Sequence, residues 1–568
     1  MSPLPPRGER PWWRDAVIYQ IYPRSFADAN GDGMGDMAGI RSRLPYLRDL
    51  GVDAIWISPF YRSPMNDAGY DVADYETVDP SLGTTEDAEL LIREAHDLGI
   101  RVIFDIVPNH TSSEHPWFQE ALRTPPGEGM WARYHCLPGR GEHGEEPPND
   151  WRCTFGGIAW TQIPDAEGNP TGWWYLHLFD HTQPDVNWEN PDVRAEYERV
   201  LRHWFDRGVD GFRIDVAHGL VKAPGYPPSG ETEDNIMGVM GEIPEQPQWD
   251  QPGVHEVFRE WRAVADSYDP PKVFVGEVWV GSPERLARYL RPDELHTAFN
   301  FDYLKTPWWS DGMRQVIDST TESAGLVGAP CTWVLSNHDV WRHATRLAPI
   351  DQDGVIDAER GLARARAGTL FMLALPGSAY VYQGEELGLP EVLDIPAEDR
   401  QDPVFFRTGG VALGRDGCRV PLPWSGTEPS YGFGPGPLSW LPQPPIWADL
   451  SVERQTGDPG STLELYRTAL AVRRAEPALG DGDWSWRELK HPHGRHLLAV
   501  ERPARDGGGG VLAVVNVGKD VATLPASWGT EVLVASGDGV AVVTSGDAED
   551  EGLAAVALAP ETAVWLRA

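Results

Sequence analysis

The chain has 568 residues, 41% of them hydrophobic and 24% charged, and its formal net charge at pH 7 is -38. This length is too great for one ordinary domain, and the composition is typical of a globular protein rather than a disordered one. So acidic a surface would repel nucleic-acid phosphates and anionic lipid. We therefore expect no nucleic acid and no membrane among its partners.

The sequence also bears on the compartment. No run of about 18 apolar residues occurs, and the first residues lack the apolar segment of a signal peptide, so we expect neither a membrane span nor secretion. The four cysteines lack metal-ligand spacing, which favours neither a zinc site nor a disulfide framework; they are Cys136, Cys153, Cys331 and Cys418. These features predict a cytoplasmic protein, either a monomer or a homo-oligomer.

Eight short apolar runs recur along the chain, and a helix-like stretch follows each of them. The runs span residues 17–22, 54–57, 102–107, 211–216, 273–277, 297–301, 332–335 and 379–382. Runs that are apolar on both faces are typical of buried parallel strands. Eight such strands alternating with helices predict an α/β fold, the (β/α)8 or TIM barrel.

The remaining segments predict two additions to the barrel. Residues 108–180 are rich in Gly, Pro, Trp and His and are too long for one crossover helix, so we expect an inserted subdomain after the third strand. Short strands separated by turn residues follow Pro477, at 497–500, 511–515, 532–534, 553–556 and 563–566, and predict an all-β sandwich domain over 477–568. The barrel would then comprise residues 1–107 and 181–476.

Polar residues stand at the carboxyl ends of several predicted strands, where the active site of such a barrel lies. Arg213 and Asp215 are two residues apart on a strand, so their side chains would point to the same side, and the Arg would hold the carboxylate ionised. Taken alone, the two could equally form a buried ion pair that stabilises the barrel. Glu277 and Asp339 add two carboxyl groups at the same face, and glycoside hydrolysis requires such a pair.

Five segments carry a resemblance to a known family. Residues 105–110 (DIVPNH), 211–215 (GFRID), 276–279 (GEVW) and 336–339 (SNHD) resemble, in this order, the four conserved regions of the α-amylase family, glycoside hydrolase family 13. Residues 183–187 (QPDVN) look like the further segment typical of its α-glucosidase and oligo-1,6-glucosidase subgroup. The resemblance extends from about residue 12 into the final β domain.

The resemblance implies a role for each carboxyl group. Asp215 would attack the anomeric carbon, Glu277 would protonate the leaving oxygen and then activate water, and Asp339 would hold sugar hydroxyls and stabilise the transition state. The implied activity is that of a retaining, exo-acting α-glucosidase, which removes terminal non-reducing α-linked glucose from short oligosaccharides of the maltose or isomaltose type.

The resemblance also implies the residues that bind sugar. His110 and His338 would hydrogen-bond the first glucose, and Asp71 would pair with Arg415 to close the pocket behind it. Structural core roles are the alternative for the histidines and for the two phenylalanines, which would otherwise stack on sugar. The full expected set is Tyr70, Asp71, His110, Phe155, Phe179, Gln183, Arg213, His338 and Arg415. Residues 415–424 read RDGCRVPLPW, where many relatives carry RDNARTPMQW.

Oxygen-bearing side chains alternate along the glycine-rich segment 28–36. This pattern suits a hard cation that takes six or more oxygen ligands, and it resembles both an EF-hand start and the calcium loop of the family. The expected ligands are the side chains of Asp28, Asn30, Asp32 and Asp36 and the carbonyl of Met34. We expect structural Ca²⁺, with Mg²⁺ and an ordinary Asp/Gly turn as alternatives, and no organic cofactor.

Several alternatives within the function stay open. An oligo-1,6-glucosidase (isomaltase) and a transglucosylating α-glucosidase share the chemistry, and the sequence does not separate α-1,4 from α-1,6 preference. Strand alternation predicts that Val216 points away from Asp215, and the resemblance associates a Val here with α-1,6 cleavage. A non-catalytic accessory barrel is the remote alternative, but it predicts loss of the catalytic carboxyl groups, and all three are present.

Overall fold

One sheet of eight parallel strands forms the centre of the molecule, in a computed structural model that describes residues 10–230, 245–489, 496–504, 509–544 and 554–568. The strand order is β11-β10-β9-β5-β2-β1-β13-β12. The strands are β1 (Val17–Ile21), β2 (Ala54–Ile57), β5 (Arg101–Ile106), β9 (Gly211–Ile214), β10 (Val273–Gly276), β11 (Thr297–Ala298), β12 (Thr332–Val334) and β13 (Ser378–Tyr382). Each lies at one of the eight predicted runs. The sheet is nearly closed, because no described ladder joins its edge strands β11 and β12.

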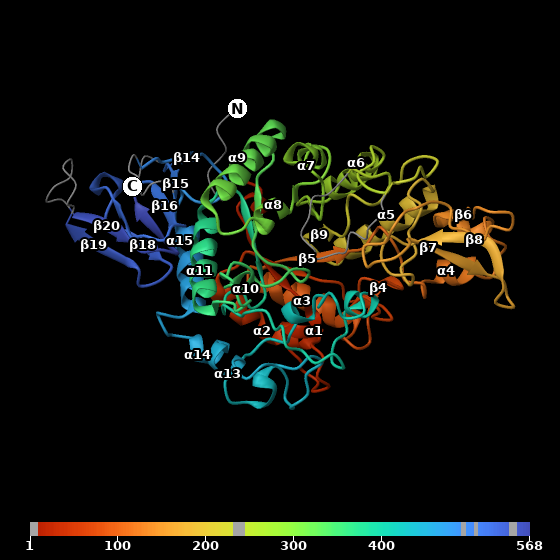
Figure 1. Cartoon of the computed structure of the whole chain (residues 1–568), viewed down its shortest axis with the longest axis horizontal. Helices are drawn as coiled ribbons and strands as arrows, with labels where there is room; N and C mark the ends of the chain where they lie inside the picture. The colour runs from red at the N-terminus through yellow and green to blue at the C-terminus, as the bar shows by residue number, and fades with distance from the viewer. Residues whose placement is uncertain (1–9, 231–244, 490–495, 505–508, 545–553) are drawn as a thin grey trace.

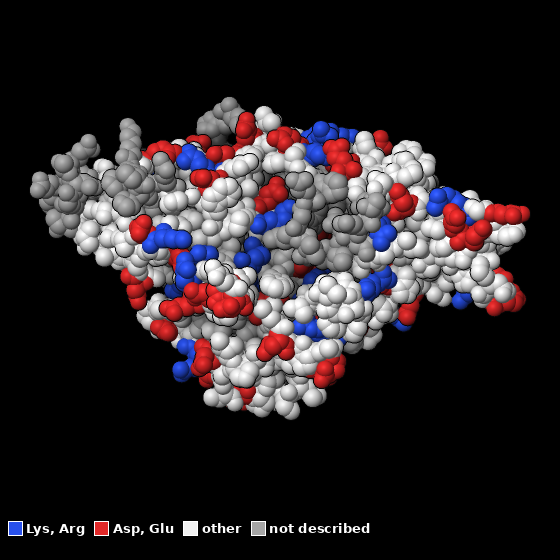
Figure 2. All heavy atoms as spheres, viewed as in Figure 1, with Lys and Arg blue, Asp and Glu red and all other residues white. Residues whose placement is uncertain are grey.

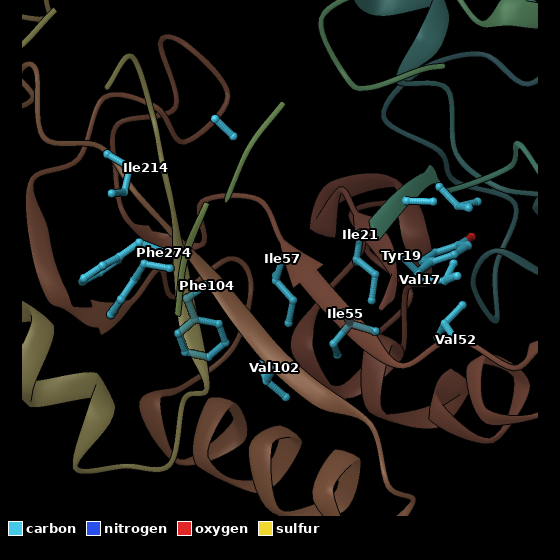
Figure 3. Close-up of a cluster of buried hydrophobic side chains, with 14 of the residues drawn as sticks. Val17, Tyr19, Ile21, Val52, Ile55, Ile57, Val102, Phe104, Ile214 and Phe274 are labelled. Atoms are coloured by element: carbon cyan, nitrogen blue, oxygen red, sulfur yellow. The ribbon is translucent and has the colours of Figure 1, made fainter. Parts of the chain in front are cut away.

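The barrel strands are apolar on both faces, as the sequence predicts. Val17, Tyr19 and Ile21 of β1 belong to the large core between the sheet and its helices, part of which Figure 3 shows. The alternate residues, such as Ile18 and Trp56, belong to a separate cluster within the barrel. The side chains of this alternate set therefore face the barrel axis. Polar residues that continue the same alternation at the strand ends lie at the barrel mouth.

Helices surround the barrel in the sequence positions that a (β/α)8 fold requires. Those of the barrel part are α1 (Pro23–Phe26), α2 (Met37–Leu50), α3 (Thr85–Asp97), α5 (Pro191–Phe205), α6 (Val254–Asp266), α7 (Pro283–Tyr289), α8 (Phe301–Lys305), α9 (Ser310–Val327), α10 (His343–Arg346), α11 (Ala358–Ala374), α12 (Pro403–Arg407), α13 (Trp447–Leu450), α14 (Val452–Gln455) and α15 (Thr462–Ala475). Among the helices of the described residues, none combines the length and apolar character needed to cross a bilayer.

A small antiparallel sheet lies between β5 and β9, where the sequence predicts an inserted subdomain. Its order is β6-β8-β7, and its elements are α4 (Pro116–Ala121), β6 (Cys136–Pro138), β7 (Trp160–Pro164) and β8 (Pro170–Leu176). Trp151, Trp160 and Phe179 form a core there with Val404 of helix α12. A two-stranded ribbon of β3 (Tyr61–Arg62) and β4 (Asp74–Val78) precedes the insertion. The boundary at residues 108 and 180 stays a prediction.

The C-terminal part contains two antiparallel sheets, of order β14-β15-β16-β21-β18 and β17-β20-β19. Leu512 and Val564 of the first share a core with Leu524 and Val556 of the second, which gives a sandwich. The strands are β14 (Ser485–Trp486), β15 (Leu497–Arg502), β16 (Val511–Asn516), β17 (Ala522–Leu524), β18 (Val532–Ala535), β19 (Val540–Thr544), β20 (Ala554–Leu558) and β21 (Thr562–Arg567). β14, β17 and β19 were not predicted.

The C-terminal sandwich is tied to the barrel through helix α11. Trp565 of β21 is fully buried and donates its indole N–H to the carbonyl of Leu370, at 3.0 Å. Glu561 accepts hydrogen bonds from Arg360 and Arg364 of the same helix. Figure 1 shows the sandwich and the β6-β8-β7 sheet at opposite ends of the molecule, with the barrel between them. Acidic side chains are scattered over the face in Figure 2 rather than gathered in one patch.

Candidate active site

A single buried arginine joins three carboxyl groups at the mouth of the barrel. The register of β5 and β9 places Asp105 beside Arg213, whose side chain is 2% exposed. Nη1 of Arg213 lies 3.0 Å from Asp105 Oδ1 and 2.6 Å from Asp215 Oδ1, and Nη2 contacts Glu277 Oε2. We call these four residues the Arg213 cluster. Asp105 was missed in the sequence, because strand register cannot be read from a single chain.

Asp215 and Glu277 directly follow the last residues of β9 and β10. Their backbone N–H groups continue the ladder, donating to the carbonyls of Ile106 and Ile214 at 2.9 Å each. Glu277 is 2% exposed, and its Oε2 also accepts the N–H of Val216 at 3.2 Å. Regular strand geometry therefore delivers both carboxyl groups to the same place.

Burial and shared charge set the protonation of this cluster. Burial raises the pKa of Asp105 to about 7, although the guanidinium of Arg213 acts against the rise. Burial likewise raises the pKa of Asp215 above its ordinary value, again opposed by Arg213 and assisted by the negative charges of Glu277 and Asp105. One guanidinium cannot neutralise three carboxylates, so the cluster tends to retain a proton near neutral pH.

Asp339 has a different environment from the Arg213 cluster. Its Oδ1 accepts from Arg415 at 3.2 Å and from Arg419 at 3.1 Å, and its Oδ2 lies 3.2 Å from Nε2 of His338. Burial would raise the pKa of Asp339, but His338 and the two guanidinium groups outweigh burial and hold this pKa below its usual range. The lowered pKa favours the ionised form of Asp339, which is suited to stabilising positive charge.

Seven of the predicted site residues line one small pocket of about 270 Å³. The lining residues are Asp67, Tyr70, His110, Phe179, Asp215, Val216, His338, Asp339 and Arg415. Glu277 is not among them; it contacts Nη2 of Arg213, whose Nη1 binds Asp215.

The structure corrects the predicted pair of Asp71 and Arg415. Nη2 of Arg415 lies 2.8 Å from Oδ1 of Asp67, whereas Asp71 accepts from the hydroxyl of Ser63 at 2.8 Å and from the backbone N–H of Asn66 at 2.9 Å. Asp71 is fully buried and stabilises the turn that carries Asp67. Burial raises the pKa of Asp71 to about 6. The two aspartates stand four residues apart, and only the turn decides which one faces the pocket.

The two phenylalanines also differ from each other. Phe179 lines the pocket, but Phe155 is fully buried and packs against Phe179 with ring centroids 5.7 Å apart. The guanidinium of Arg415 lies 5.3 Å from the Phe155 ring. Phe155 therefore packs against the guanidinium of Arg415. Its buried position does not support the prediction that Phe155 stacks on sugar.

The two histidines of the pocket are held as neutral rings. Burial lowers the pKa of His110 to about 4. Its Nε2 lies 3.0 Å from the carbonyl of Tyr70 and 3.1 Å from the amide of Gln183. His338 stacks on the Tyr70 ring, with centroids 5.2 Å apart and an interplanar angle of 5°. These contacts fix the orientation of both rings beside the pocket.

Val216 lies elsewhere than strand alternation predicts. β9 ends at Ile214, and Val216 adopts a φ of 44°, in the left-handed region. The alternation rule therefore no longer applies, and Val216 lines the pocket beside Asp215. The neighbouring Gly219 leaves the necessary room, because a Cβ there would lie 2.8 Å from Cγ1 of Val216.

A buried lysine near the pocket was missed in the sequence. Nζ of Lys222 lies 2.7 Å from Oδ2 of Asp185 and 3.0 Å from Oδ1 of Asn109, and its side chain is 1% exposed. The ammonium group thus joins the segment after the insertion to the motif that carries His110. A lysine in an irregular loop gives no signal of such a role.

The glycine-rich segment 28–36 forms a turn held by its own hydrogen bonds. The carboxylate oxygens of Asp28 accept loop N–H groups at 2.6 and 2.9 Å, and Asp36 caps helix α2. Asn30 and Asp32 each accept a backbone N–H at 2.8 Å, the second from Met34. Within the described residues, no group of three or more His, Cys, Asp or Glu side chains is arranged to hold a metal.

Comparison with known proteins agrees with this site. The model of the α-amylase catalytic domain matches residues 20–482. The chain is 40% identical to a probable α-glucosidase of Rhizobium meliloti, over 85% of this chain and 86% of that protein. It is 34% identical to an oligo-1,6-glucosidase of Parageobacillus thermoglucosidasius, over 82% and 84% of the two chains.

A solved structure agrees as well. The α-glucosyl transfer enzyme XgtA superposes with a TM-score of 0.83 at 34% identity, over 98% of this chain and all of that one. The fold, the ordered motifs and the sequence identity point to the same conclusion: this chain is a member of the α-amylase family and a glycoside hydrolase.

Proposed function

We propose that the protein is a retaining, exo-acting α-glucosidase that removes terminal glucose from short α-linked oligosaccharides. The observation that carries the proposal is the shared guanidinium of Arg213, which binds the nucleophile Asp215 on one nitrogen and the acid/base Glu277 on the other. A shared guanidinium holds the two carboxyl groups close together, and a short separation is the arrangement that favours retention over inversion.

The proposed reaction has two displacements. A carboxylate oxygen of Asp215 forms a bond to the anomeric carbon while the glycosidic C–O bond breaks and Glu277 gives its proton to the departing oxygen. Water then attacks the same carbon, the ester to Asp215 breaks, and Glu277 takes the proton from water. Ionised Asp339 stabilises the positive charge that develops on the sugar in both steps.

The closed end of the pocket supports exo action. Arg415 spans from Asp67 to Asp339, and its Nε also lies 2.7 Å from Oδ2 of Asp402. This buried network stands behind the space for the first sugar, so a chain could not extend past it. A terminal glucose is the unit that fits, and maltose- or isomaltose-type sugars are the expected substrates.

Linkage and acceptor remain alternatives within the proposal. The relatives named above include an oligo-1,6-glucosidase and a glucosyl transfer enzyme, so isomaltase or transglucosylating activity stays a candidate. An accessory role without catalysis has less support, because Asp215 and Asp339 line the pocket and Glu277 shares Arg213 with Asp215. A reducing cytoplasm stays our prediction for the compartment, and the four cysteines, all described, form no disulfide.

The stereochemistry of the first product tests the proposal. Because two inversions restore the configuration, proton NMR at early times should show α-glucose before mutarotation. Asp215→Asn should abolish this release while leaving the melting temperature within a few degrees, since an amide cannot replace the nucleophile. Early release of β-glucose would contradict retention.

The corrected aspartate pair makes a second prediction. Asp67→Asn should lower kcat/KM on maltose by on the order of 100-fold, because it removes the charge of one of the three buried carboxylates that hold Arg415. Asp71→Asn should mainly lower the melting temperature and reduce kcat/KM by less than about 10-fold, because Asp71 holds the turn rather than the sugar. A larger kinetic loss in the Asp71 variant would restore the original pairing.

The volume at Val216 makes a third prediction. Removing two methyl groups in Val216→Ala should widen the wall and raise the kcat/KM ratio of maltose to isomaltose by roughly 10-fold. Val216→Thr keeps the volume and is the matched control that separates space from polarity. An unchanged ratio in both variants, or a wild type inactive on isomaltose, would remove Val216 as a selector of linkage.

Calcium binding by residues 28–36 stays a prediction from the sequence. The hydrogen bonds within the turn neither require a metal ion nor take its place. If Ca²⁺ binds the native state, dialysis against EDTA should remove about one equivalent of metal and lower the melting temperature, and added Ca²⁺ should restore it. Asp32→Asn is a suitable variant because Asp32 is exposed. Unchanged metal content and melting after EDTA would identify an ordinary turn.

A further inference from the structure

The general acid/base of the proposed reaction accepts a hydrogen bond from a tryptophan outside the Arg213 cluster. Nε1 of Trp279 donates a hydrogen bond of 2.8 Å to Oε1 of Glu277. The other oxygen of Glu277, Oε2, is already bound by Arg213 and by the N–H of Val216. The two oxygens therefore differ: the ion pair with Arg213 lies on Oε2, and no cation among the described residues pairs with Oε1.

The indole of Trp279 packs against a neighbouring aromatic ring. It stacks on the ring of Phe301 with centroids 3.8 Å apart and an interplanar angle of 3°. Phe301 is buried and begins helix α8, whose Lys305 lies 5.7 Å from the Trp279 ring. Trp279 itself is only half-buried and borders a cavity of about 330 Å³. A residue that served packing alone would not need this directed N–H.

We infer that Trp279 is a positioning residue for Glu277: its indole N–H orients Oε1 and stabilises the negative charge that appears there when the proton leaves. This inference rests on the proposed function, in which Glu277 is the acid/base. It extends that function to a residue that none of the sequence-predicted roles includes.

The hydrogen bond from Trp279 to Glu277 acts in the first displacement. Two donors at Oε2 disfavour a proton on that oxygen, so the transferable proton belongs on Oε1. As the O–H bond at Oε1 breaks and the proton joins the glycosidic oxygen, the carboxylate charge grows beside the indole N–H. A donor already in place lowers the cost of that charge without reorganisation.

The test compares two leaving groups in wild type and Trp279→Phe. The second glucose of maltose leaves through its glycosidic oxygen and needs the proton, whereas α-glucosyl fluoride releases fluoride, which needs little acid assistance. Phe keeps the ring for stacking on Phe301 and removes only the N–H. We expect kcat/KM on maltose to fall on the order of 10- to 100-fold, the usual effect of losing a hydrogen bond to a charged group. On the fluoride it should fall less than about threefold.

Two further variants complete the design. Trp309→Phe removes an indole that is 54% exposed and should leave both rates unchanged. Phe301→Leu keeps the indole N–H of Trp279 but removes the ring on which Trp279 stacks. It should give a smaller loss of kcat/KM that is still confined to maltose. This variant tests the inference even if Trp279→Phe folds poorly.

The outcomes separate the inference from the function beneath it. Equal losses on both substrates, or no loss on either, in a folded Trp279→Phe would show that Trp279 does not serve Glu277. If the wild type cleaves neither substrate, the proposed function itself fails.

Discussion

The buried guanidinium of Arg213 is the interaction on which the site depends. It lies within the barrel with its side chain 2% exposed, where an unpaired charge would be very costly, so it requires carboxylate partners. Three neighbouring strands supply them, through Asp105, Asp215 and Glu277. The same arrangement that makes the cation tolerable brings a nucleophile and an acid/base together, and the excess of carboxyl groups favours a retained proton.

Residues outside the Arg213 cluster orient its side chains and complete the pocket. Strand parity points the carboxyl groups to the barrel mouth, and the turn of residues 65–71 presents Asp67 to Arg415. Arg415 then closes the pocket and helps to keep Asp339 ionised, whereas burial raises the pKa values of Asp105 and Asp215 nearby. Carboxyl groups at the same barrel mouth are thus shifted in opposite directions, which sets Asp339 apart as the charge stabiliser.

The sequence predicted those features that depend on local pattern. All eight barrel strands and the positions of Asp215, Glu277 and Asp339 follow from apolar runs that end in polar residues, and the family follows from motif order. Features that depend on backbone reversal were not predictable. Val216 leaves the strand pattern through a left-handed φ, and Met65 and Ala68, also with positive φ, turn Asp67 rather than Asp71 toward the pocket.

Contacts between distant segments were equally hidden. Asp105 meets Arg213 only through strand register, and Phe155 packs behind Arg415 across 260 positions of sequence. In the C-terminal sandwich, β14 and β17 are too short to give a periodic signal. A single sequence encodes such contacts, but its local periodicity does not display them.

Trapping of the covalent intermediate tests the central claim most directly. A slow 5-fluoro-α-glucosyl fluoride should form the ester rapidly and hydrolyse it slowly, so that mass spectrometry of the digested protein would find one fluoroglucosyl group on the peptide that contains Asp215. The account predicts that this label appears in step with loss of activity and is absent from Asp215→Asn. A label on another carboxyl group, or turnover of the reagent by an enzyme that never carries a label, would contradict it.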